Sequence, residues 1–200
     1  MKTLGKKSNL YVLLDVNIII QAHVCGVWEQ IVSRVTLVMP SIVVGEATHY
    51  TDPESGVRME IHLDDHIANG SLIEVAATPD QLTSLRARFD RLFLERMDAG
   101  EAEALALLLA GELPDHRFCT GDGPAIKALA LLDMADTGLS FEALLRDVGL
   151  QRGKIPLQYT EKFFQDFLAR GAQDRIQGVG IAKPTPAKSA TASRTRRKRK

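Results

Sequence analysis

Several features that would place this chain in a common functional class are missing. Its 200 residues include only two cysteines, Cys25 and Cys119, which are too few for a disulfide framework and fit a reducing compartment. The chain has no G-x-S-x-G, P-loop or G-x-G-x-x-G motif, so acyl hydrolase, nucleoside triphosphatase and dinucleotide-binding activities lack support. It also has no internal repeat.

Long apolar segments are missing as well. The amino-terminal MKTLGKK and the apolar stretch after it resemble the start of a secretory signal. However, Asp15 and Asn17 interrupt that stretch, and no A-x-A-like cleavage site follows promptly. No other run is long and apolar enough to cross a bilayer. We therefore expect a cytoplasmic protein with no membrane contact.

The formal net charge is zero, but the charges are unevenly placed. Eight of the 25 basic residues lie from Lys183 to Lys200, where no acidic residue occurs. The rest of the chain therefore has 17 basic residues against its 25 acidic ones, which makes it an acidic body with a basic tail.

This tail ends in RTRRKRK and contains no aromatic residue that would stack on a base. Such a segment attracts nucleic-acid phosphates without reading sequence. We interpret it as a weak electrostatic anchor for RNA; the alternatives are a solubilising tail and a segment that folds back onto the acidic body. The candidate nucleic-acid-binding residues are Arg194, Arg196, Arg197, Lys198, Arg199 and Lys200.

Apolar runs in the remaining chain alternate between strand-like and helix-like patterns. This alternation predicts an α/β fold with a mostly parallel sheet, and the chain is long enough to bury a core. From Gly178 on, the composition cannot form a core. The predicted strands span residues 10–14, 36–40, 71–77 and 116–120. The predicted helices span 17–35 with a break near Gly26, 41–50, 59–68, 78–96, 100–112, 123–133, 140–148 and 160–170.

Four acidic residues follow predicted strands or open predicted helices. Asp15 ends the first strand in LLDVN, and Asp122 follows the strand RFCT in TGDG. Glu46 lies one turn into the helix after the second strand, and Glu101 opens the helix in DAGEAEALALLL. Because the carboxyl ends of parallel strands meet at one edge of a sheet, where active sites gather, the four carboxylates can converge there.

Each acid also has a purely structural explanation. Asp15 and Asp122 suit helix N-caps, Asp98 and Glu101 have the spacing of a capping box, and Glu46 could face solvent. As a group, however, the carboxylates would repel one another unless a cation lay among them. Several oxygen ligands suit Mg²⁺ or Mn²⁺.

Helix phase favours Glu101 as the inward-facing acid of its helix. Glu101 shares a face with Leu105 and Leu108, whereas Glu103 points in roughly the opposite direction. The helix is apolar nearly all round, so Glu103 remains the alternative.

Four segments resemble the PIN-domain ribonucleases when taken in their order: LYVLLDVNIII, VVGEATHY, AGEAEALALLLA and FCTGDGPAIKALA. That family includes the toxins of many bacterial and archaeal toxin–antitoxin pairs, and the resemblance covers residues 9–149. It implies a three-layer α/β/α PIN-like domain at residues 1–150. A C-terminal helical extension (151–178) and a disordered basic tail (179–200) would follow.

The resemblance further implies an endoribonuclease that hydrolyses RNA phosphodiester bonds with bound Mg²⁺ or Mn²⁺. Among the four acidic residues, Asp15, Glu101 and Asp122 would be metal ligands, and Glu46 would be an outer ligand or orient the attacking water. Asn17 and Thr120 would support them by hydrogen bonds. The catalytic residues carried over from the family pattern are Asp15, Glu46, Glu101 and Asp122.

By the same resemblance, a cognate antitoxin and a homodimer are the expected partners besides RNA. One alternative is a nucleic-acid-binding protein that keeps the fold without the chemistry. Another is a nuclease acting on DNA. All four acidic positions are filled, which favours activity, and no DNA-specific module is present.

A zinc site is a weaker interpretation of the segment HLDDH. His62 and His66 have an i, i+4 spacing that can bind zinc, but Leu63 stands where a metalloprotease has Glu. A solvated helix face is the better interpretation.

Overall fold

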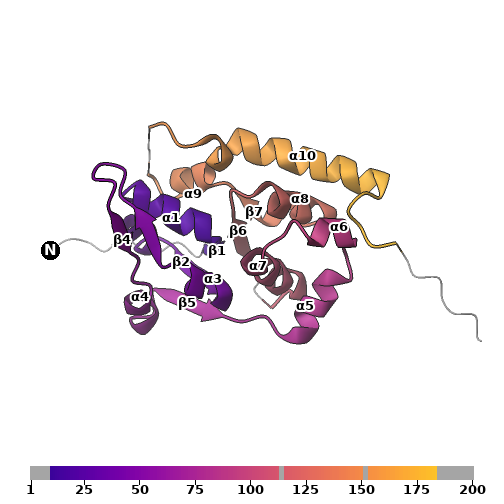
Figure 1. Cartoon of the computed structure of the whole chain (residues 1–200), viewed down its shortest axis with the longest axis horizontal. Coiled ribbons are helices and arrows are strands. Elements are labelled where there is room, and N and C mark those ends of the chain that lie inside the picture. Colours follow the sequence, from indigo (N-terminus) through magenta and orange to yellow (C-terminus); the bar gives the residue numbers. More distant parts are fainter. Residues whose placement is uncertain (1–9, 113–114, 151–152, 184–200) are drawn as a thin grey trace, which may run out of the picture.

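A five-stranded sheet runs through the computed structural model, which describes residues 10–112, 115–150 and 153–183 (Figure 1). All four strand pairings are parallel, so the expected α/β fold with a parallel sheet is confirmed. The carboxyl ends of all the strands therefore lie at one edge. In spatial order the strands are β5 (Leu72–Val75), β2 (Thr36–Pro40), β1 (Tyr11–Leu14), β6 (His116–Cys119) and β7 (Gly138–Leu139).

Strand β1 lies at the centre of the sheet because its side chains are apolar on both faces. Val12 and Leu14 contribute to one hydrophobic core, and Leu13 contributes to a second core. This follows from the two-residue period of a strand, which sends successive side chains to opposite faces. The residue after Leu14 is thereby held at the middle of the carboxyl edge.

Helices cover both faces of this sheet. Residues of α1, α2 and α9 belong to the first core, and residues of α5, α7, α8 and α10 belong to the second. No helix in the described part of the chain is long and apolar enough to span a membrane. The α-helices are α1 (Val16–Val24), α2 (Trp28–Val32), α3 (Ser41–Glu46), α4 (Asp64–Ala68), α5 (Pro79–Arg86), α6 (Arg91–Leu94), α7 (Ala99–Ala110), α8 (Gly123–Leu131), α9 (Phe141–Asp147) and α10 (Glu161–Gln177). Two 3₁₀ turns, η1 (Ala135–Thr137) and η2 (Leu157–Tyr159), join some of them.

Two of the predicted helices are wrong in extent, because part of each forms a small antiparallel hairpin. The helix expected over 41–50 ends at Glu46, and β3 (His49–Thr51) follows it. The helix expected over 59–68 is reduced to α4, since β4 (Arg58–Glu60) pairs with β3. Every residue of β4 is exposed, so this strand lacks the alternation of buried and exposed residues that would have predicted it.

The helix predicted over 78–96 is also wrong, because it breaks into α5 and α6. Phe89, in the break, is buried and forms a β-bridge with Ile181, and Asp90 donates its N–H to Gly180. Residues 180–182, expected to belong to a disordered tail, are thus paired with the domain. Residues 184–200, with the basic cluster, lie outside the described residues.

Helix α10 is longer than predicted and packs along α8 (Figure 1). Gly171 allows this close approach, since a Cβ there would lie 2.8 Å from both the Cβ of Ala130 and the carbonyl oxygen of Lys127. Lys127 also forms an ion pair with Asp174 at 2.6 Å. The C-terminal extension is therefore fixed against the helix that follows β6.

Beside α1, three rings stack on one another: His23 of α1, Trp28 of α2 and Tyr50 of the hairpin. The ring of His23 stacks between Trp28 and Tyr50, at centroid distances of 5.0 and 5.2 Å. Trp28 donates its ring N–H to His66. His62 precedes α4, so the two histidines of HLDDH do not share a helical face, and the solvated face expected there is wrong for His66.

Acid is expected to weaken the fold through His23. Its pKa falls to about 4, first because burial disfavours the charged ring and then because of the charge of His66. The unfolded chain, with an ordinary pKa of 6.5, thus binds a proton that the folded chain does not. The contribution of His23 to stability is therefore fully present above pH 6.5 and is lost as pH falls toward 4. We expect protonation of this partly exposed ring to lower the free energy of unfolding by about 1–2 kcal/mol.

Urea unfolding at a series of pH values measures this loss. The His23→Phe variant keeps the stacked ring without the titrating nitrogens, so its stability should fall less on acidification. Equal acid sensitivity in the two proteins would contradict the role given to His23.

Candidate active site

Asp15 lies at the carboxyl end of β1, where the chain enters α1. Its N–H still pairs with the carbonyl oxygen of Cys119 in β6, at 3.2 Å. One of its carboxylate oxygens accepts the N–H of Asn17 at 3.3 Å, which caps α1, and the other accepts the Thr120 hydroxyl at 3.0 Å. Only 3% of the residue is exposed. Asp15 is therefore both an N-cap and a buried acid.

The electrostatics of Asp15 are those of an acid in a cluster. Burial raises its pKa to about 6, although the hydrogen bonds from Thr120 and Asn17 favour the ionised form. The charges of Asp98 and Asp122 raise the pKa further. The carboxylate thus lies among other carboxylates.

Asp122 comes to the same edge from the TGDG turn after β6. The hydroxyl of Thr120 accepts the N–H of Asp122 at 3.0 Å while it donates to Asp15, so one side chain links the two acids. Asp122 caps α8 by accepting the N–H of Ala125 at 3.0 Å. Burial raises the pKa of Asp122, against the hydrogen bonds from Ala125 and Glu101.

Glu101 reaches the cluster from the first turn of α7. It forms the predicted capping box with Asp98: the N–H of Glu101 donates to Asp98 at 2.8 Å, and that of Asp98 donates to Glu101 at 3.2 Å. Its carboxyl group also hydrogen-bonds that of Asp122. Burial raises the pKa of Glu101 to about 9, together with the charges of Asp122, Asp98 and Asp15. At neutral pH, Glu101 therefore carries a proton that it shares with Asp122.

Glu103, the alternative third acid, has different partners. It is as buried as Glu101, so the expectation that helix phase turns it away from the interior is wrong. Its two oxygens accept the N–H of Ile42, at the start of α3, and that of Ala77, after β5, each at 3.0 Å. Both oxygens are thus taken up by the backbone. Between these two acids, Glu101 is the one that bonds Asp122.

Glu46 lies at the rim of the cluster, at the end of α3. Its side chain is exposed, and one of its oxygens lies 3.8 Å from the point that a Cβ on Gly100 would occupy. An oxygen of Asp98 lies 3.7 Å from the same point. Glu46 therefore borders the first turn of α7 from the solvent side.

The three acids provide only oxygen ligands, which are the ligands that Mg²⁺ and Mn²⁺ prefer; Asp15 and Glu101 are buried, and Asp122 is half-buried. Within residues 10–112, 115–150 and 153–183, no group of three His, Cys, Asp or Glu side chains is positioned so that it could hold a metal ion. Instead, Glu101 and Asp122 are bonded to each other. Burial, together with the charges of neighbouring carboxylates, raises the pKa of each of the three acids, and a divalent cation could take the place of the shared proton.

A cavity of about 320 Å³ opens beside Asp122 and Asn17. Tyr159 closes one side of it and donates its hydroxyl to the carbonyl oxygen of Asn17 at 3.4 Å. The exposed side chain of Asn17, expected to support the carboxylates, lines this cavity, while its backbone N–H supports Asp15.

Two residues of the site were not expected from the sequence. Asp98 was interpreted only as a cap, although its charge acts on all three acids of the cluster. The signal was present, because a capping box places its aspartate next to whatever its glutamate touches. Tyr159 carried no local signal, since its contact with Asn17 joins segments far apart in the chain.

The chain was compared with protein-family models, with curated proteins and with solved structures, and none of them matches it.

Proposed function

We propose that this protein is a metal-dependent endoribonuclease of the PIN type, with a three-layer α/β/α catalytic domain. The observation that carries the proposal is the meeting of Asp15, Glu101 and Asp122, which three separate segments bring together at the carboxyl edge of the sheet. The central position of β1, with β6 beside it, is consistent with this function, because ligand sites of parallel sheets lie at that edge.

The composition of the cluster matches the needs of phosphodiester hydrolysis. Carboxylates alone would repel an anionic phosphodiester, so a cation is required to invert the local charge. Bound Mg²⁺ or Mn²⁺ would supply that charge, a water of lowered pKa and stabilisation of the phosphate oxygens. Asp15, Glu101 and Asp122 are the residues that would hold it.

The surrounding residues orient this cluster. Thr120 and the backbone of Asn17 fix the two oxygens of Asp15, and β1 gives them a rigid mount. Glu46, which is exposed at the rim, would orient a water that enters from solvent. In this proposal, every acid of the family pattern has a distinct task.

Cleavage of RNA is expected to require a divalent cation. The measurement uses a pool of labelled single-stranded and structured RNAs and, separately, labelled DNA, each incubated with Mg²⁺, with Mn²⁺ or with EDTA, and metal binding is measured in parallel. Fragments should appear with either metal and be absent with EDTA. Metal binding without cleavage of any RNA would instead support a nucleic-acid-binding protein, and cleavage of DNA alone would support a DNA nuclease.

Protein partners are proposed for an apolar surface at the end of α10. Leu92 of α6 and Ile176 of α10 are 70% and 82% exposed, and Val179 is 52% exposed. The two regions are joined by the hydrogen bond from Asp90 to Gly180 at 3.0 Å. A homodimer or a cognate antitoxin of a toxin-type nuclease would cover this surface.

A further inference from the structure

The C-terminal extension forms part of the wall around the acidic cluster. Tyr159 packs directly on Gly121, where an added Cβ would lie 2.7 Å from its ring. Phe167 packs on Gly123, where the corresponding distance is 2.2 Å. The two glycines that flank Asp122 thus leave room for aromatic rings of the extension. The extension is therefore built into the site.

The cavity beside Asp122 is lined by amide and aromatic residues. Its walls are the amide side chains of Asn17 and Gln158, the ring of Phe163 and the turn that carries Asp122. Its volume of about 320 Å³ lies near the lower end of the range for small-ligand sites. Gln158 hydrogen-bonds Tyr159, which holds its amide at the wall. Amides bond the edges of bases, and aromatic rings stack on their faces.

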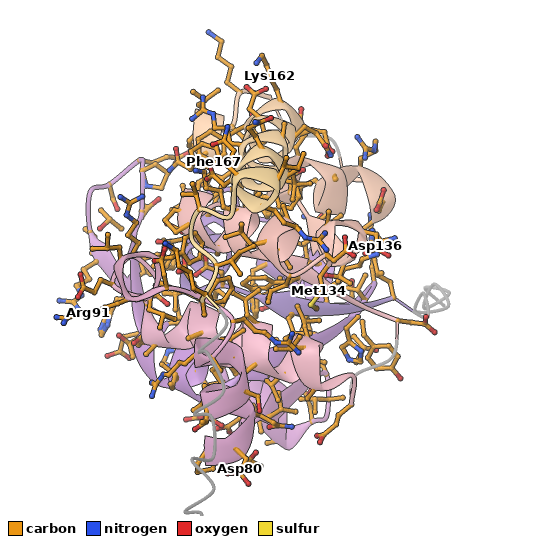
Figure 2. The ribbon with its side chains drawn as sticks, turned by 90° about the vertical axis from the view of Figure 1, so that its right-hand side faces the viewer. Asp80, Arg91, Met134, Asp136, Lys162 and Phe167 are labelled. Carbon is orange, nitrogen blue, oxygen red and sulfur yellow. The ribbon has the colours of Figure 1, made fainter. Side chains whose placement is uncertain are left out.

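Helix α10 continues this stacking surface. The ring centroids of Phe163 and Phe167 are 4.5 Å apart, and the guanidinium carbon of Arg170 lies 4.9 Å from the Phe167 ring centroid. The spacing of these residues places them on one face of the helix. In Figure 2, which looks nearly along α10, Lys162 points outward and Phe167 lies closer to the domain. Aromatic rings with a stacked arginine are typical of sites that bind single-stranded nucleic acid.

We propose that this cavity binds the base of a nucleotide next to the scissile phosphate of single-stranded RNA. Phe163 provides the stacking face, and Gln158 and Asn17 bond the edge of the base. This inference rests on the proposed nuclease function, which places the scissile phosphate at the acidic cluster beside the cavity. It adds a base-binding subsite supplied by the C-terminal extension.

Binding of labelled single-stranded tetranucleotides, one for each base, tests this subsite by fluorescence anisotropy with the full chain. EDTA prevents cleavage, and about 0.3 M salt weakens the electrostatic contribution of the tail while leaving stacking in place. Phe163→Leu should weaken binding about tenfold, the effect of losing one base–aromatic stack. Gln158→Ala should weaken it less and change the preference among the four bases.

Tyr11→Leu is the matched control, because it also replaces an aromatic residue by leucine but lies at the amino edge of the sheet. Its affinity should equal that of the wild type. If Phe163→Leu fails to fold, the exposed Gln158 carries the test. No measurable binding by the wild type, or equal affinity in all the proteins, would overturn the subsite.

The outcomes also separate this inference from the function on which it rests. Binding that depends on Phe163 and Gln158, without RNA cleavage under any metal condition, would support the base-binding subsite and contradict the nuclease function. Cleavage that depends on Asp15 but has the same kcat and KM in Phe163→Leu as in the wild type would support the nuclease function and contradict the base-binding subsite.

Discussion

Replacing Asp15 by asparagine is expected to abolish RNA cleavage and, at about pH 8, to stabilise the fold. Loss of a charged metal ligand should reduce the cleavage rate by at least about 10²–10³-fold, the cost of removing a group that stabilises charge in a transition state. The free energy of unfolding should rise, because the wild-type protein must keep the carboxylate of Asp15 ionised in a buried site at this pH. Its pKa is about 6 in the folded chain, against an ordinary value of 3.8.

The sign of the stability change follows from these two values. A carboxyl group whose pKa is raised by folding contributes its full stability below the ordinary pKa and loses it as pH rises through 6. Asparagine does not titrate, so the variant escapes this loss. After allowing for one weaker hydrogen bond, we expect a gain of about 2 kcal/mol at about pH 8, or about 4–8 °C in melting temperature.

Thermal unfolding without metal, measured from about pH 4 to 8, shows whether the gain grows with pH. Both proteins contain His23, so its effect cancels in the difference. Asp136→Asn is the matched control, since Asp136 is exposed and precedes β7, at the amino edge of the sheet (Figure 2). Full activity of Asp15→Asn with metal present would remove the proposed function.

Replacement of Glu101 by glutamine is expected to affect mainly cleavage, whereas replacement of Glu103 is expected to affect mainly stability. Glu101→Gln should abolish cleavage and change stability by no more than about 0.5 kcal/mol at neutral pH, since glutamine resembles the protonated acid. Its amide can donate to Asp122 and accept from Asp98 as the protonated carboxyl group does. Glu103→Gln should instead cost about 2–3 kcal/mol, because one part-buried N–H, of Ile42 or Ala77, would face an NH₂ group.

Urea unfolding and cleavage by the folded protein at low temperature distinguish the two residues. Each variant is the control for the other, because both replace a buried glutamate of α7 by its amide. Loss of cleavage in a folded Glu103→Gln protein, with normal cleavage in Glu101→Gln, would assign the third acid to Glu103.

The elements that the sequence predicts well are those whose apolar pattern agrees with their final environment. Strand β1 is apolar on both faces and lies at the centre of the sheet, and the helices predicted to start at Thr78 and Ser140 do start there, with these residues as their N-caps. The hairpin was missed because β4 is exposed throughout. The break between α5 and α6 depends on the pairing of Phe89 with Ile181, which no local pattern encodes.

The candidate site was predicted in the same uneven way. Asp15 and Asp122 follow buried strands, so their approach to one edge can be inferred from topology alone. The choice between Glu101 and Glu103 could not be made from helix phase, because both are buried and only their hydrogen-bond partners differ. Tyr159 was beyond inference, since its place depends on how the extension packs against the turn around Asp122.

The packing of aromatic rings on the TGDG turn has a consequence for how the protein is made. A ribosome releases the chain from its amino end, so the turn with Asp122 emerges before Tyr159 and Phe167, the rings that cover its glycines. In the growing chain, this turn therefore lacks its final surroundings until α10 has been synthesised. If the chain is the nuclease proposed above, such an order of assembly would delay cleavage of RNA while the chain is still attached to its own message.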